Sequence, residues 1–255
     1  MSVQSYIEKR ASEAVLSADE KASIDKSIQT LRSRLDGWFA VDLREHFRFG
    51  SSTRGTILPR LMNANSDIDY MIVWNEGGYK PQTYLDRLRR FVEYYYSRSE
   101  IKQSSPTIVL ELNHIKFDLV PALHWYSGTY QIPDGATSWQ YTNPTEFSKT
   151  LEAKNGSELY KIKPTIRLAK YWNARTGVYE SFSLEKWIVG LSYFGIGNSK
   201  DYLFRVFDEM SSYQEQQWRA GAIQRAKAII SKVREYEKND MPYSAEAEIK
   251  KLLPE

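Results

Sequence analysis

The sequence predicts an α+β fold in which a long N-terminal helix precedes a mixed sheet and a helical part closes the chain. Apolar residues recur at helical spacing near the N-terminus, β-forming segments follow, and helical periodicity returns from Pro144 onward. We therefore expect a sheet-containing lobe at residues 1–143 and a helical lobe at residues 144–255. With 42% hydrophobic and 26% charged residues, the 255-residue chain has the composition of a folded globular protein.

The long first helix is expected from Ala18 to Phe39. Ser17 and Glu20 form a capping-box pattern, in which each side chain satisfies a backbone N–H at the start of the helix. The apolar positions that follow recur at helical spacing, at Ile24, Ile28, Leu31, Leu35 and Trp38. This spacing predicts an amphipathic helix.

The sheet is expected to begin with a short strand over Glu45–Phe49, which ends at Gly50. Asp67–Trp74 follows as a strand rich in β-forming residues. Pro81 then opens an aromatic-rich helix that reaches about Arg98, since proline is favoured in the first turn of a helix.

Two further strands are predicted at Thr107–Leu112 and Ile115–Ala122. Only Asn113-His114 separates them, which is the spacing of a tight hairpin. After Pro144 the pattern becomes helical. The helices are expected over about Thr145–Lys154, Lys161–Ala174, Ser183–Phe194 and Tyr213–Lys238.

Two acidic residues open the second strand, in Ser66-Asp67-Ile68-Asp69. Because side chains alternate along a strand, Asp67 and Asp69 lie on one face while Ile68 points to the other. Neighbouring carboxylates repel each other, and a divalent ion that prefers oxygen ligands turns this repulsion into coordination. The chain has no cysteine and only three histidines, so any catalytic metal is expected on carboxylates. Mg²⁺ or Mn²⁺ is the expected ion.

Asp-x-Asp patterns also occur by chance in exposed loops and, in enzymes, in sugar-nucleotide glycosyltransferases and in phosphatases with an Asp nucleophile. In both enzyme classes the acids follow a hydrophobic strand. Here the apolar run Tyr70–Trp74 comes after the acids, which argues against both classes.

The segment Gly50-Ser51-Ser52-Thr53-Arg54-Gly55-Thr56 offers backbone N–H groups and hydroxyls that suit a polyphosphate. It is not a P-loop, because a P-loop has Lys and then Ser or Thr after the second glycine. This chain has Thr56 and Ile57 there. A simple Gly/Ser turn is the alternative interpretation.

Asp118 lies among apolar neighbours in Ile115-Lys116-Phe117-Asp118-Leu119-Val120-Pro121. A carboxylate inside a buried strand is tolerated mainly when it is ion-paired, hydrogen-bonded or bound to a metal. Asp118 is therefore a candidate for a third metal ligand, with a structural salt bridge as the alternative.

Taken together, Gly50-Ser51, Asp67-x-Asp69 and Asp118 resemble the polymerase-β-like nucleotidyltransferase superfamily in their order and spacing. The resemblance implies that the first two acids bind two metal ions and that the third completes the site, which lowers the pKa of the attacking hydroxyl. It also implies that the Gly-Ser turn holds the triphosphate, with Arg54 among the nucleotide-binding residues. Two such ions clamp the attacking and leaving oxygens of an in-line displacement.

A narrower resemblance, to the bacterial cGAS/DncV-like nucleotidyltransferases (CD-NTases) and the oligoadenylate synthases, extends to about Gly190. Its matching stretches are FGSSTRGTILP, SDIDYMIVW, IKFDLVPAL, TSWQYTNPTEF, KPTIRLAKYW and SFSLE. It implies that Lys170 and Ser183 contact phosphates of the incoming nucleotide from the helical lobe. A surface lysine and a helix N-cap, respectively, are the alternatives. The cysteines of the zinc insertion in the animal DNA sensor are absent, so control by double-stranded DNA is not implied.

The resemblance implies an enzyme of bacterial antiviral signalling that joins nucleoside triphosphates into a cyclic or short linear oligonucleotide second messenger. A cytoplasmic location is expected, because the N-terminal residues lack the apolar core of a signal peptide. ATP is the first substrate candidate, followed by GTP and the pyrimidine triphosphates. AMP transfer to a protein or RNA acceptor and a non-catalytic nucleotide-binding scaffold are the alternatives.

The basic residues near the expected site are few, chiefly Arg54, Arg167 and Lys170, which favours a small acceptor over a long nucleic acid. No membrane partner is expected, because no apolar run is long enough to span a bilayer. The identity of any regulatory protein partner is open.

Overall fold

A computed structural model describes residues 2–104 and 106–255. These residues form two compact units. The first, which we call the sheet unit, comprises Leu16–Arg60 and Ala64–Lys149. The second, the helical unit, comprises the residues up to Val15, Leu61–Asn63 and Thr150–Glu255. The functional division predicted from the sequence, 1–143 and 144–255, stays a prediction.

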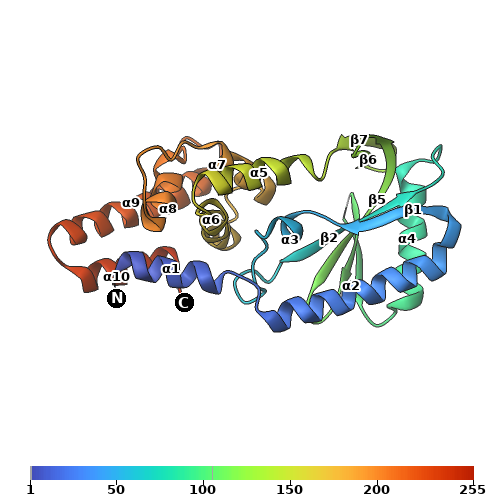
Figure 1. Ribbon diagram of the computed structural model, residues 1–255, viewed down its shortest axis with the longest axis horizontal. Coiled ribbons are helices and arrows are strands. Elements are labelled where there is room, and N and C mark those ends of the chain that lie inside the picture. Colours follow the sequence, from blue (N-terminus) through green and yellow to red (C-terminus); the bar gives the residue numbers. More distant parts are fainter. Residues whose placement is uncertain (1, 105) are drawn as a thin grey trace. The chain divides into compact units, whose positions relative to one another are not determined.

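The sheet unit holds the long helix and the mixed sheet that the sequence predicts, so the α+β fold class is confirmed (Figure 1). Its elements are α2 (Ala18–Phe39), η1 (Ala40–Asp42), β1 (Leu43–Arg48), α3 (Ser51–Arg54), β2 (Asp67–Trp74), α4 (Pro81–Tyr95), β3 (Glu100–Ser104), β4 (Thr107–Glu111), β5 (Lys116–Tyr126), β6 (Thr129–Asp134), β7 (Ser138–Thr142) and the start of α5 (Glu146–Ser157).

The main path of the sheet has the strand order β1-β2-β5-β4-β3, and β6 and β7 extend it from the far end of β5. β2 and β5 run parallel, while the other neighbours are antiparallel. β2 and β5 are far apart in the sequence, with α4, β3 and β4 between them. Their hydrogen-bonded pairing determines which residues of the two strands lie side by side.

Alternation along β2 gives the sheet two different faces. Ile68, Tyr70, Ile72 and Trp74 belong to a large apolar core that also takes in residues of α2 and α4, which cover this face (Figure 1). On the other face, Met71 and Val73 join a smaller cluster with Ala122 and Tyr130. That face continues toward the start of β2, where the side chains are acidic.

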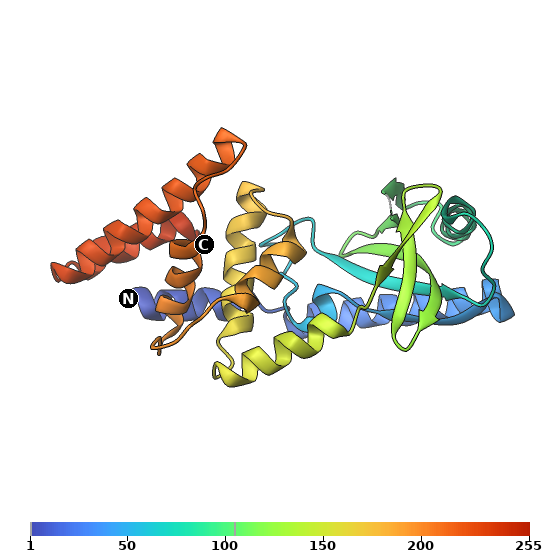
Figure 2. The same cartoon turned by 90° about the horizontal axis from the view of Figure 1, so that it is seen from above.

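The helical unit is built around α6. Its elements are α1 (Val3–Glu13), α6 (Ile162–Thr176), α7 (Ser181–Gly190), α8 (Ser199–Glu209), α9 (Gln217–Lys238) and α10 (Pro242–Leu252), together with most of α5. α1 packs on α6, α8 and α10, and α9 and α10 lie side by side (Figure 2). The Tyr6 hydroxyl donates to the carbonyl of Leu253, and the Tyr171 hydroxyl donates to that of Pro254, at 2.5 and 3.0 Å.

Several predicted elements agree closely with the structure. α2 has the predicted bounds, and both halves of its Ser17–Glu20 capping box are present. β2 also matches, and the turn between β4 and β5 is closed by a hydrogen bond from Leu112 N–H to the carbonyl of Ile115. No helix in the described part of the chain is both long and apolar enough to cross a membrane.

Other predicted bounds differ. α4 ends at Tyr95 rather than near Arg98, α9 begins only at Gln217, and α7 spans Ser181–Gly190 rather than Ser183–Phe194. The alternative role of Ser183 as a helix N-cap is wrong. Glu180 caps α7 instead, because its carboxylate accepts hydrogen bonds from the backbone N–H groups of Phe182 and Ser183.

Candidate functional site

The register of β2 and β5 brings the three predicted acids onto one face of the sheet. Asp69 pairs directly with Asp118, and Asp67 pairs with Lys116. Ile68 and Phe117, which lie between these positions, point to the opposite face and are buried in the main core. Asp67, Asp69 and Asp118 therefore project from adjacent positions of two neighbouring strands.

Asp118 has one carboxylate oxygen in an unfavourable environment. Its Oδ1 is buried and has no hydrogen-bond partner. Burial, and to a lesser extent the negative charge of Asp67, raise the pKa of Asp118 from 3.8 to about 6. The positive charge of Lys116 lowers this pKa, but by less than the other two causes raise it. A buried carboxylate oxygen without a donor is costly in free energy, so this atom is suited to a cation or to a donated hydrogen bond.

Asp67 has a cationic neighbour. The ammonium nitrogen of Lys116 lies 3.3 Å from Asp67 Oδ2. About a fifth of the Lys116 side chain and about a third of the Asp67 side chain are exposed to solvent. The pair joins the first residues of β2 and β5, which are in register. This contact was not predicted from the sequence, because it depends on the pairing of two strands far apart in the chain.

Gly50 packs directly against Asp69. A Cβ atom at position 50 would lie 1.8 Å from Asp69 Oδ2 and 2.6 Å from its Cγ. Gly50 also has φ 72° and ψ −151°, a conformation that side chains strongly disfavour. The backbone of residue 49 donates its N–H to the carbonyl of Asp69 at 3.0 Å. Only glycine allows the turn and the acid to lie this close.

The turn after Gly50 forms the short helix α3. The hydroxyls of Ser52, Thr53 and Thr56 each donate to a backbone carbonyl of the segment from Phe49 to Ser51. The Ser51 hydroxyl makes no such bond among the described residues. This leaves it available to a ligand, as the predicted phosphate contact requires.

Arg54 is placed differently from a freely exposed phosphate ligand. Its side chain is buried at 7% exposure, and its guanidinium lies over the ring of Phe147, 5.4 Å from the centroid. A stacked guanidinium is still positively charged, so it adds positive electrostatic potential at the site. Its predicted role in nucleotide binding stays a prediction.

The three acids have the chemistry of a divalent-metal site. They are hard oxygen donors on one face, and one of their oxygens is buried without a partner, which fits a divalent cation. In the described residues, however, no three Asp, Glu, His or Cys side chains are gathered closely enough to enclose an ion. The residue types and their placement fit the ion, and the side chains must still converge to bind it.

Lys170 and Ser183 lie in the helical unit. Lys170 is 8% exposed, and its ammonium lies 2.8 Å from Glu185 Oε1, itself buried in α7. The alternative of a solvated surface lysine is therefore wrong. Ser183 is exposed and lines a cavity of about 330 Å³ with Tyr179 and Trp187. Their predicted contacts with phosphates stay predictions.

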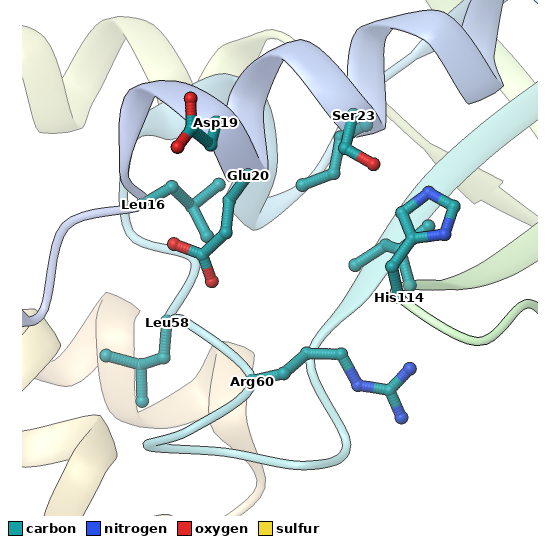
Figure 3. A pocket seen from close by; sticks show the side chains of 9 residues that line it. Leu16, Asp19, Glu20, Ser23, Leu58, Arg60 and His114 are labelled. Atoms are coloured by element: carbon teal, nitrogen blue, oxygen red, sulfur yellow. The ribbon is translucent and has the colours of Figure 1, made fainter.

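A separate cavity of about 250 Å³ lies in the sheet unit between the start of α2, the segment with Leu58 and Arg60, and the β4–β5 turn (Figure 3). Its walls are largely apolar, and its described lining includes none of the predicted site residues. Arg60 is held there by Glu111, and His114 by Ser27. These two side chains therefore already have structural partners.

With this geometry established, comparison with known proteins identifies the class. A family model described as "Second Messenger Oligonucleotide or Dinucleotide Synthetase domain" (SMODS) matches residues 1–155. The chain is a nucleotidyltransferase, as the resemblance implied. It belongs to the SMODS family, whose members are nucleotide second-messenger synthases. No curated protein matches the chain.

Solved structures share the fold over nearly the full chain. The Escherichia coli MS115-1 CdnC:HORMA-deltaN complex has a TM-score of 0.73 at 17% identity, covering 98% of this chain and 96% of that one. CdnC from the same source with ATP gives 0.73 at 15% identity, covering 99% and 98%. The Elizabethkingia meningoseptica CdnE cyclic dinucleotide synthase with GTP and Apcpp gives 0.68 at 15% identity, covering 87% and 96%. At these identities the likeness establishes the CD-NTase fold.

Proposed function

We propose that this chain joins nucleoside triphosphates into a small cyclic oligonucleotide at Asp67, Asp69 and Asp118 and releases pyrophosphate. The observation that carries the proposal is the register of β2 and β5, which sets Asp69 beside Asp118, with Asp67 on the same face. Membership of the family supports the reaction class. The three carboxylates are the proposed ligands of the metal ions that this reaction needs.

In this proposal, the three acids hold two Mg²⁺ or Mn²⁺ ions, which when bound stabilise charge on the attacking and leaving oxygens. A ribose hydroxyl oxygen of one nucleotide attacks the α-phosphorus of another, and the hydroxyl proton passes by way of the Asp118 carboxylate to solvent. The bond from that phosphorus to the oxygen bridging to the β-phosphate breaks, and pyrophosphate leaves with the electron pair. A second transfer of the same kind closes the ring.

The protein's own groups position the reactants. Asp118 presents a carboxylate oxygen that is buried and has no hydrogen-bond partner in the described residues. It is suited to accept a hydrogen bond from the attacking hydroxyl. The Gly50 turn holds the triphosphate through backbone N–H groups and the Ser51 hydroxyl. Lys170 and Ser183 add phosphate contacts, with Lys170 shared between Glu185 and the nucleotide.

The substrates are proposed from the solved relatives. Structures of CdnC with ATP and of CdnE with GTP and Apcpp support purine triphosphates as substrates here. The CdnC complex with HORMA-deltaN supports a regulatory protein partner of the same kind. A role in bacterial antiviral signalling is part of this proposal.

A small acceptor is favoured over a long strand. Templating or elongating enzymes hold nucleic acid in a continuous basic groove. Arg54 lies over Phe147, and Lys170 is buried against Glu185, so neither forms an open basic surface. The second candidate, AMP transfer to protein or RNA, predicts label on a macromolecule instead.

Incubation with Mg²⁺ or Mn²⁺ and α-labelled triphosphates tests the proposal. The expected product is a small labelled species that resists alkaline phosphatase and forms without primer, template or protein acceptor. Asp69→Asn, which removes one oxygen ligand, is the matched inactive control. A phosphatase-sensitive ladder would indicate linear oligomers, and label on a polypeptide would contradict the proposal.

A further inference from the structure

We infer that Lys116 is an internal counter-ion of Asp67 that competes with the divalent ion, so that the site fills with metal mainly when a nucleotide is bound. This inference rests on the metal assignment in the proposed function. It assigns Lys116 as a positioning residue that acts through Asp67.

The Lys116 ammonium lies beside one of the carboxylates that would hold the metal. It lies 3.3 Å from Asp67 Oδ2, and both residues occupy paired positions on the strands that carry the acids. Lys116 is two residues before Asp118, so its side chain leaves β5 on the same face as the acids. One oxygen of the proposed metal site is therefore engaged by a cation of the protein itself.

This ion pair gives a physical reason why the acids do not enclose an ion among the described residues. Asp67 is held by Lys116, and Asp69 packs against Gly50, while Asp118 Oδ1 remains buried without a partner. To bind a metal through Oδ2, Asp67 exchanges the ammonium for the metal. The metal must therefore compete with a tethered positive charge at short range.

A nucleoside triphosphate changes this balance. Its phosphate oxygens add several negative charges and further ligands for the same ion. They also provide an alternative partner for the released ammonium. Binding of metal and nucleotide then becomes mutually favourable, and thermodynamic linkage requires each to strengthen the other by the same factor. Lys116 thus weakens metal binding to the empty enzyme and raises this coupling.

The test is a titration of Mn²⁺, followed by its EPR signal, against the wild type and Lys116→Met, each with and without a non-hydrolysable ATP analogue. We expect Lys116→Met to lower the Kd for Mn²⁺ in the nucleotide-free protein about tenfold, equivalent to about 1.4 kcal/mol. The ratio of the Kd values without and with nucleotide should shrink. Lys116→Arg keeps the charge and should keep weak binding.

Lys102→Met is the matched control. Lys102 pairs with exposed Glu100 on β3, which β4 separates from β5, so the variant removes the same charge away from the acids. It should leave the Kd unchanged. A Kd for Lys116→Met equal to or weaker than that of the wild type, or no Mn²⁺ binding by either protein without nucleotide, would overturn the inference.

The proposed function has a separate readout in the same experiment. Asp69→Asn and Asp118→Asn should lose Mn²⁺ binding even with the nucleotide analogue. If they keep it, the metal assignment itself fails. If they lose it while Lys116→Met behaves as the wild type, only the role of Lys116 is wrong.

Discussion

Replacement of Asp118 by Asn should stabilise the metal-free protein while it abolishes nucleotidyl transfer. Asp118 carries a buried, unpartnered Oδ1 beside the charge of Asp67. These surroundings oppose ionisation. Asn has nearly the same shape and no charge, so it relieves the penalty and removes the proposed metal ligand in one step.

The magnitude follows from the pKa. Asp118 titrates at about 6 in the folded protein, against 3.8 for an ordinary aspartate. Between these values the folded state binds the proton more tightly than the unfolded state. The contribution of Asp118 to stability is therefore fully present below about pH 4 and is lost as the pH rises through 6. At about 1.4 kcal/mol per pKa unit, the loss approaches 3 kcal/mol, and solvent screening of the partly exposed group reduces it to about 2 kcal/mol.

Urea unfolding of both proteins in EDTA, at intervals from pH 4.5 to pH 7.5, measures this effect. The free energy of unfolding of Asp118→Asn should exceed that of the wild type by an amount that grows with pH and levels off above pH 7. Mn²⁺ added together with a non-hydrolysable ATP analogue should then stabilise only the wild type, since a ligand of the folded state raises its stability. A variant that is less stable at neutral pH, or a difference independent of pH, would refute the reasoning.

Three further variants test the other parts of the site. Gly50→Ala forces a Cβ to within 1.8 Å of Asp69 Oδ2 at a φ of 72°. Nucleotidyl-transfer activity should fall by more than about 100-fold, and the free energy of unfolding in urea should fall by roughly 1–3 kcal/mol. Near-normal turnover would disprove the tight packing. Ser51→Ala should raise the KM for nucleoside triphosphate up to about tenfold without a change in stability, since it removes one contact among several; unchanged kinetics would leave Ser51 as a turn residue. Glu185→Gln takes the carboxylate partner from buried Lys170, and the melting curve should show about 3 kcal/mol lower stability; a loss below about 1 kcal/mol would contradict a tightly coupled pair.

Local patterns were sufficient to predict much of the sheet unit. The Ser17–Glu20 capping box and the helical spacing after it fixed the bounds of α2, because both signals lie within a few residues. Alternation placed Asp67 and Asp69 on one face for the same reason. The tight loop after β4 identified the β4–β5 hairpin, which carries Asp118.

Tertiary contacts explain what the sequence did not reveal. The pairing of Lys116 with Asp67 depends on the parallel register of β2 and β5, which no local pattern specifies. The burial of Lys170 depends on the packing of α7 on α6, where Glu185 neutralises it. Two local signals are typical of elements outside the predicted set: Asp134-Gly135 lies at the β6–β7 turn, and Pro242 begins α10.

The central claim is that the three acids catalyse phosphodiester formation between two small nucleotides. Mass spectrometry of the products from ATP and GTP with Mn²⁺ tests it most directly. We predict a product of the wild type with the mass of nucleoside monophosphate units joined in a ring, with one pyrophosphate lost for each unit. Asp69→Asn should not make this product. Two results would contradict the claim: formation of the same cyclic product by Asp69→Asn, or a wild type that makes only linear products with a terminal triphosphate.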